Sequence, residues 1–346
     1  MKRAIFDDIG SYPLPEGVTK EWLKDAFANL ELPSYKNKLY EIIKEAMWQK
    51  INAGVGVPNY PQFRNMIAQF SEPIMDGERT EAPLLIKEEE AKMVEMNALE
   101  EMAKEYMERK GKKLKVRICV TGPVELYYHQ FPPPVYIDVL SNIAKSIGRF
   151  IKHAVEEATN YEVKCVSIDE PSMGLDPRIE EEGIITALEL ASEYAFKKNV
   201  DTQIHLHSPI FYETVCQVEG ISVIGLESAA NPSLLALIDK KQLDTYDKFL
   251  RIGVSRTDIL SMAAEYDEIH HTNAFKEKGV LETIVNEYNS PDKVKKRMEK
   301  AYSIFDDRIK YVGPDCGLGP FPNQELAYLV LKNTSEGIKA FYNEWK

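Results

Sequence analysis

The chain has 346 residues, of which 44% are hydrophobic and 28% are charged, and its formal net charge at pH 7 is −12. That balance is ordinary for a globular protein, and it argues against a general nucleic-acid binder or a protein of anionic membrane surfaces, because both need a surplus of Lys and Arg. The four cysteines show no CxxC spacing, and the N-terminus lacks the apolar stretch of a signal peptide. We therefore expect a reduced, cytoplasmic protein with no membrane span and no nucleic-acid partner.

Short apolar runs alternate with amphipathic segments along the chain. We predict strands near residues 4–9, 53–57, 116–120, 164–168, 202–207, 222–227, 249–254 and 309–312. We predict helices near residues 22–30, 35–51, 83–110, 136–159, 179–198, 211–218, 232–238, 258–266 and 324–345. Strands that alternate with helices pair in parallel, and eight such units predict a (β/α)8 TIM barrel.

The segment between the second and third predicted strands is too long for a single crossover. We predict that it holds an extended helical insertion at about residues 70–115, whose Glu- and Lys-rich face is solvated. No low-complexity linker or clear internal repeat interrupts the chain, so residues 1–346 are predicted to form a single elaborated domain.

Polar and turn residues follow each predicted strand, at the end of the barrel where TIM-barrel chemistry takes place. These strand ends are Gly10-Ser11-Tyr12-Pro13, Asn59-Tyr60-Pro61-Gln62, Thr121-Gly122-Pro123, Asp169-Glu170-Pro171, His205-Leu206-His207, Glu227-Ser228, Ser255-Arg256-Thr257-Asp258 and Asp315-Cys316-Gly317. A thiol, two close histidines and several carboxylates thus gather at one rim, which predicts a functional site there.

The histidines, a glutamate and a cysteine of this rim are residue types that bind zinc. His205 and His207 are two residues apart, so they share one face of their strand. Each residue alone also fits a structural role: the histidines as satisfied core residues, Glu227 as a helix cap and Cys316 as a packed small hydrophobe. Taken together, on successive strand ends, they favour a metal site.

Six short motifs, in order, resemble the catalytic domain of cobalamin-independent methionine synthase. Pro314-Asp315-Cys316-Gly317-Leu318 is similar to that family's Asn-Pro-Asp-Cys-Gly-Leu turn. The other matching motifs are Ile9-Gly10-Ser11-Tyr12-Pro13, Val120-Thr121-Gly122-Pro123-Val124, Ile168-Asp169-Glu170-Pro171, Gln203-Ile204-His205-Leu206-His207 and Glu227-Ser228. The resemblance covers nearly the whole chain and implies a TIM barrel like the short, mostly archaeal core enzymes, which lack the large N-terminal duplicated domain.

The resemblance also implies a set of site residues. By position, His207, Glu227 and Cys316 would be the zinc ligands, with His205 as a possible extra one. Ser11 and Asp169 would line the amino-acid end of a homocysteine site. A methylated corrinoid protein would be the methyl donor, docking near His129 and the loop Pro132-Pro133-Pro134.

Several positions depart from the family pattern. Pro209 stands where the family has a further zinc-binding cysteine, and Cys216 is too far along the chain to replace it well. Tyr60 and Gln62 lie in the segment where the family has the glutamate that binds the substrate amine. The acid–base histidine after the seventh strand is absent from the segment that holds Arg256 and Asp258.

These observations give a prediction of function. We expect a zinc-dependent methyltransferase acting on a small thiol, with Asp169 and Asp258 as candidate catalytic residues and Ser11, Tyr60, Gln62, Asp169 and Arg256 as candidate substrate-binding residues. Homocysteine is the methyl acceptor that the resemblance implies. Arg256 fits an anionic thiol such as coenzyme M, or else forms an ion pair with Asp258 or another rim acid. The remaining alternative is a non-catalytic binding or accessory protein on the same scaffold.

Overall fold

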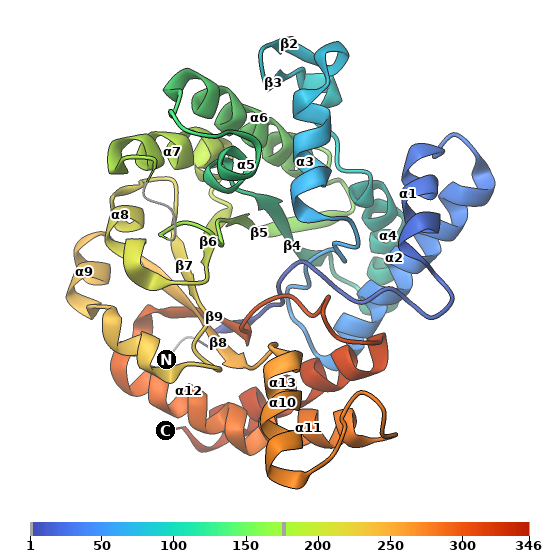
Figure 1. Ribbon diagram of the computed structural model, residues 1–346, viewed down its shortest axis with the longest axis vertical. Helices are drawn as coiled ribbons and strands as arrows, with labels where there is room; N and C mark the ends of the chain where they lie inside the picture. Colours follow the sequence, from blue (N-terminus) through green and yellow to red (C-terminus); the bar gives the residue numbers. More distant parts are fainter. Residues whose placement is uncertain (1–2, 175–177, 346) are drawn as a thin grey trace. The chain divides into compact units, whose positions relative to one another are not determined.

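The computed structural model describes residues 3–174 and 178–345 (Figure 1). Its main sheet has seven strands in the order β1-β9-β8-β7-β6-β5-β4. The strands are β1 (Ile5–Phe6), β4 (Leu114–Thr121), β5 (Tyr161–Asp169), β6 (Asp201–Leu206), β7 (Val223–Leu226), β8 (Phe249–Ser255) and β9 (Ile309–Pro314). The pairs β1/β9, β4/β5, β5/β6 and β6/β7 are parallel. The predicted α/β fold of the TIM-barrel type is therefore confirmed.

Helices separate the strands along the chain, as parallel pairing requires. They are α1 (Lys20–Ala28), α2 (Pro33–Ala53), α3 (Met66–Met75), α4 (Glu95–Lys110), α5 (Pro123–Gln130), α6 (Ile137–Glu156), α7 (Glu181–Lys197), α8 (Tyr212–Gln217), α9 (Lys240–Thr245), α10 (Ile259–His270), α11 (Val280–Tyr288), α12 (Pro291–Phe305) and α13 (Gln324–Glu344). Among the helices of the described residues, none has the length and apolar character that a membrane crossing requires.

The predicted second strand, residues 53–57, is wrong. Ala53 is the last residue of α2, and Gly54 ends that helix with φ of 105°. Beyond it, only isolated bridges join Val57 to Asp7 and Gln62 to Ser11. Pro58 and Pro61 lack backbone N–H groups, so this segment is poorly suited to a continuous ladder.

The insertion before β4 differs from the prediction in its first half. Residues 80–86 form an antiparallel hairpin of β2 (Thr80–Ala82) and β3 (Leu85–Ile86), which contacts α3, and α4 begins only at Glu95. The predicted helix over residues 83–110 is therefore wrong before Glu95. The Ser146 side chain of α6 explains this, because its Oγ accepts from the Ile86 N–H (2.9 Å) and donates to the Leu84 carbonyl (2.7 Å).

Two helices that we did not predict, α11 and α12, lie between β8 and β9. The signal for α12 is visible in the sequence, because Ser290 caps the helix and Pro291 is its first residue.

The internal contacts of the chain divide it into two compact units. Unit 1 comprises Met1–Phe63, Glu227–Leu235 and Ile252–Lys346, and unit 2 comprises Arg64–Leu226 and Ala236–Arg251. In unit 2 the strands β4, β5 and β6 are almost wholly buried, and α6 packs against α7. In unit 1, α13 packs against α2, α11 and α12. A single domain over residues 1–346 stays a prediction.

Candidate metal and substrate site

The two histidines lie at the carboxyl end of β6, in unit 2. His205 is 4% exposed, whereas His207 follows the last strand residue and is exposed. Their ring centroids are 5.4 Å apart. His205 is in register with Asp169 of β5 and with Gly225 of β7. A Cβ on Gly225 would stand 2.9 Å from the Ile204 carbonyl, so glycine lets β7 approach the backbone of β6 closely beside His205.

Asp169 ends β5 next to the histidine strand, as predicted. It is 6% exposed, and its Oδ1 accepts a 2.6 Å hydrogen bond from Ser167 Oγ. The hydroxyl comes from the same face of the strand, two residues earlier. This bond fixes the orientation of the carboxylate.

Glu170 is fully buried and anchors α5, a role that sequence reasoning missed. Its two carboxylate oxygens accept from the N–H groups of Val124 (3.0 Å) and Glu125 (2.6 Å), in the first turn of the helix. Its own N–H donates to the His205 carbonyl at 3.0 Å. Burial raises the pKa of Glu170 well above its usual range, and the two N–H donors oppose that shift. Glu170 thus joins β5, β6 and α5.

In unit 1, the turn that carries Cys316 is tied to the loop after β7. Asp315 is 3% exposed and accepts from the N–H groups of Ala229 and Ala230, both at 2.8 Å. Burial raises the pKa of Asp315 to about 7, with a smaller contribution from the Glu227 charge, while the two N–H donors and Arg297 lower it. This carboxylate therefore holds the Glu227 loop and the Cys316 turn as one structural element.

Ser11 lies against the same turn. Its carbonyl accepts from Leu318 N–H (2.8 Å) and its Oγ accepts from Gly319 N–H (3.3 Å). A Cβ on Gly317 would stand 3.1 Å from Ser11 Cβ and closer still to Ser11 Oγ, so only glycine fits there. The structure thus brings Ser11 to the half-buried Cys316, which the sequence had separated by three hundred residues.

Tyr60 and Gln62 follow the bridge at Val57 and reach the neighbourhood of Ser11. Tyr60 is fully buried and Gln62 is 6% exposed. Gln62 forms a parallel bridge with Ser11, and its N–H donates to the Gly10 carbonyl at 3.0 Å. Backbone contacts therefore hold Gln62 beside the predicted amino-acid end, and the Tyr60 carbonyl accepts from Asn59 Nδ2 at 2.6 Å.

Arg256 makes ion pairs with two carboxylates. Its guanidinium donates to Asp258 (3.0 and 2.6 Å) and to Glu265 of α10 (2.9 and 2.7 Å), and its Cζ lies 5.0 Å from the Tyr288 ring centroid. The hydrogen bond from Arg256 lowers the pKa of Glu265. The ion pair with Asp258, one of the two roles predicted for Arg256, is thus present. A role of either residue in substrate binding or catalysis stays a prediction.

The register of β6 and β7 places two of the candidate metal ligands at the same end of neighbouring strands. Leu206 pairs with Leu226, and the next residues are His207 and Glu227, so the two follow neighbouring strands at the same end. Imidazole, carboxylate and thiolate are the usual zinc donors. In the part of the chain that the structure describes, His205, His207, Glu227 and Cys316 form a group that could hold a metal ion.

Neither Pro209 nor Cys216 adds a ligand. Pro209 begins a short 3-10 helix, Pro209–Phe211. Cys216 is 1% exposed within α8, and burial raises the pKa of its thiol to about 11. It is therefore a protonated core residue, in keeping with the expectation that it is a poor substitute for the family cysteine.

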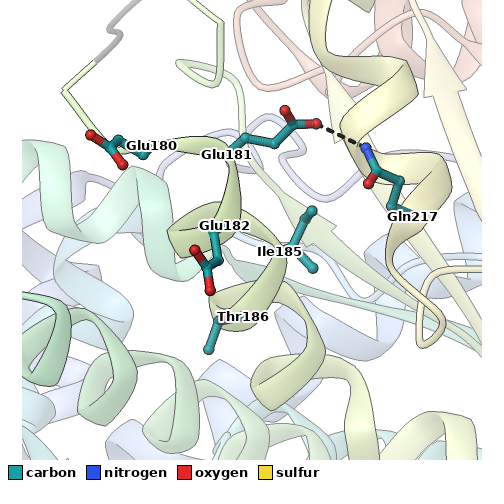
Figure 2. A pocket seen from close by; sticks show the side chains of 6 residues that line it. All are labelled: Glu180, Glu181, Glu182, Ile185, Thr186 and Gln217. Carbon is teal, nitrogen blue, oxygen red and sulfur yellow. Dashed lines mark hydrogen bonds between the residues drawn. The ribbon is translucent and has the colours of Figure 1, made fainter.

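A surface hollow in unit 2 is separate from these residues. It is lined by Glu180, Glu181, Glu182, Ile185, Thr186 and Gln217 (Figure 2). Glu181 accepts from Gln217 Nε2 and from Thr214 Oγ1, both at 2.9 Å. These bonds tie α7 to α8, so they give Glu181 a structural role, and no predicted site residue lines the hollow.

Comparisons with known proteins agree with the motif resemblance. No protein-family model and no curated protein matches the chain. Among solved structures, a B12-independent methionine synthase from Shewanella sp. W3-18-1, in complex with selenomethionine, has a TM-score of 0.65 at 14% identity, over 99% of both chains. A putative vitamin-B12-independent methionine synthase from Listeria monocytogenes has a TM-score of 0.58 at 14% identity, over 98% of this chain and 99% of that one. A methyltransferase from Methanosarcina mazei has a TM-score of 0.57 at 11% identity, over 99% and 95%. These likenesses show a shared fold, and at that level they confirm the resemblance.

Proposed function

We propose that this protein is a zinc-dependent methyltransferase whose methyl acceptor is a thiol. The observation that carries the proposal is the donor set of His205, His207, Glu227 and Cys316 at the ends of parallel strands. The fold shared with methionine synthases and a methyltransferase supports it.

The chemistry of the donor set fits zinc. Cys316 supplies a thiolate, Glu227 a carboxylate oxygen and His207 an imidazole nitrogen, and three protein ligands with one open position are typical of catalytic zinc. His205 is the possible fourth ligand in place of the family cysteine, which Pro209 replaces here. Bound zinc would act as a Lewis acid that keeps a substrate thiol as thiolate at neutral pH.

The chain's own residues would position the ligands and the substrate. Asp315 holds the Cys316 turn against the loop of Glu227 through two backbone N–H groups. Ser11, Gln62 and the Asp169 carboxylate would bind the polar end of the thiol. The thiolate sulfur would then attack the methyl carbon in line with the leaving group, so that the S–C bond forms as the bond to the donor breaks.

Homocysteine, giving methionine, is the proposed acceptor, and a methylated corrinoid protein is the proposed donor. A sulfonate thiol such as coenzyme M is the alternative acceptor. The two carboxylates already bound to Arg256 argue against that alternative, because a sulfonate would compete with both of them.

Metal analysis of protein purified with added zinc tests the proposal. We expect about one zinc per chain in the wild type and in Cys216→Ala, and a clear loss of zinc in Cys316→Ala and Glu227→Ala. A thermal-shift series with homocysteine and coenzyme M then tests the acceptor, because a ligand that binds only the folded state raises the melting temperature. Wild-type protein that binds no zinc would refute the proposed chemistry and leave the non-catalytic alternative.

A further inference from the structure

A fully buried ion pair lies beneath the predicted amino-acid end of the site. Lys50 of α2 and Asp8, just after β1, are 0% and 1% exposed, and Lys50 Nζ is 2.7 Å from Asp8 Oδ2. Lys50 Nζ also lies 4.9 Å from the ring centroid of Tyr12, the residue after Ser11. Burying two charges costs several kcal/mol per ion, so such a pair is weak as a stabilising device.

The pair holds both backbone groups of one residue. Asp8 Oδ1 accepts from the Asn59 N–H at 2.8 Å, and Lys50 Nζ donates to the Asn59 carbonyl at 2.9 Å. Asn59 in turn donates from its side chain to the Tyr60 carbonyl at 2.6 Å. These are the bonds that a neighbouring strand would make, and this is the segment where the predicted second strand is reduced to isolated bridges. The side chains of Lys50 and Asp8 therefore replace the backbone hydrogen bonds of a strand ladder.

We propose that Lys50 and Asp8 are positioning residues that place Tyr60 and Gln62 beside Ser11 and so set the affinity of the site for its thiol. The proposal rests on the proposed function. Neither charged group reaches the surface, and the pair holds the site segment through the Asn59 backbone. An uncharged pair that makes the same hydrogen bonds to Asn59 should preserve thiol affinity. An uncharged pair that cannot make these bonds should lower it.

Two double variants separate hydrogen bonding from charge. In Asp8→Asn/Lys50→Gln, an amide oxygen replaces the acceptor and an amide nitrogen replaces the donor for Asn59. In Asp8→Leu/Lys50→Met, both polar groups are gone but the volume is filled and no charge is left unpaired. Lys248→Met is the matched control for the loss of a buried lysine. Lys248 immediately precedes β8, is 4% exposed, and donates to the Val218 and Ile221 carbonyls between α8 and β7.

Homocysteine affinity of the zinc-loaded proteins is measured by calorimetry, together with zinc content and melting temperature. We expect Asp8→Asn/Lys50→Gln and Lys248→Met to stay within about threefold of the wild-type Kd. We expect Asp8→Leu/Lys50→Met to bind at least tenfold more weakly with unchanged zinc content. Equal affinity in the two double variants would overturn the proposal. If Asp8→Leu/Lys50→Met does not fold, the comparison of Lys50→Gln with Lys50→Met decides in the same way.

Hydrogen exchange separates failure of this inference from failure of the proposed function. If the wild type binds no thiol, the function is wrong, but the backbone of residues 59–62 still reports on the pair. We expect amide exchange there to be at least tenfold faster in Asp8→Leu/Lys50→Met than in Asp8→Asn/Lys50→Gln. Equal exchange in the two proteins would refute the positioning role.

Discussion

Gly122→Ala is expected to destabilise the protein, because a side chain there would displace Glu170. A Cβ on Gly122 would stand 2.6 Å from Glu170 Cγ and closer still to the carboxyl group. The backbone itself accepts alanine, since φ of Gly122 is −72°. Any loss of stability in Gly122→Ala is therefore due to the steric clash and not to a backbone conformation that only glycine adopts.

The magnitude follows from the bonds that Glu170 makes. Moving its carboxyl group weakens the two buried hydrogen bonds from the Val124 and Glu125 N–H groups, and a buried donor left without its partner costs about 1–3 kcal/mol. Overpacking destabilises the folded state by about 1–3 kcal/mol more. The lower entropy of the unfolded alanine variant stabilises the fold by about 0.4–1 kcal/mol. We expect a net loss of about 3–5 kcal/mol in the free energy of unfolding.

Urea unfolding, followed by circular dichroism, measures this loss. Gly77→Ala is the control in the same unit, because Gly77 has a negative φ and no atom within 4 Å of a built Cβ; it should change stability by less than about 1 kcal/mol. In Gly122→Ala/Glu170→Ala the clash is absent, so the double variant should be about as stable as Glu170→Ala alone. A loss below about 1 kcal/mol in Gly122→Ala, or additive losses in the double variant, would refute the reasoning.

Two further predictions concern the other charged and titrating groups. Burial raises the pKa of Cys216 to about 11, so as the pH rises the thiol ionises first in the unfolded chain. In metal-free protein, the free energy of unfolding of the wild type relative to Cys216→Ala should therefore be constant from pH 6 to 8. It should fall by up to about 2 kcal/mol as the pH rises through 9 to 11. A flat difference up to pH 11 would contradict the burial of this thiol. If Arg256 binds an anionic thiol, Glu265→Gln should strengthen coenzyme M binding several-fold, because one competing charge is removed, and Arg256→Ala should weaken it. Equal affinities in wild type and both variants would exclude Arg256 from the substrate site.

Much of the fold could be predicted from the sequence because the local hydrophobic patterns agree with the architecture of the sheet. The apolar runs that became β4, β5, β6, β8 and β9 are each flanked by helix-forming segments, and burial on both faces makes such strands nearly continuous in hydrophobicity. The hairpin at residues 80–86 was missed because its backbone partner is Ser146, sixty residues away. The second strand was overpredicted because an apolar run shows composition but not whether a ladder partner is present.

The sequence alone determined the fold class, the chemistry of the candidate metal ligands and their place at strand ends, because strand periodicity and residue type are local properties. Only the tertiary structure decided how these residues are held: Asp315 by the amides of Ala229 and Ala230, Ser11 by the Gly317–Gly319 turn, and Asn59 by Lys50 and Asp8. It also showed that Arg256 is paired with both Asp258 and Glu265. The partners of Asp315, Ser11 and Asn59 are distant in the chain or are backbone groups, which carry no sequence signal, so packing alone brings them together.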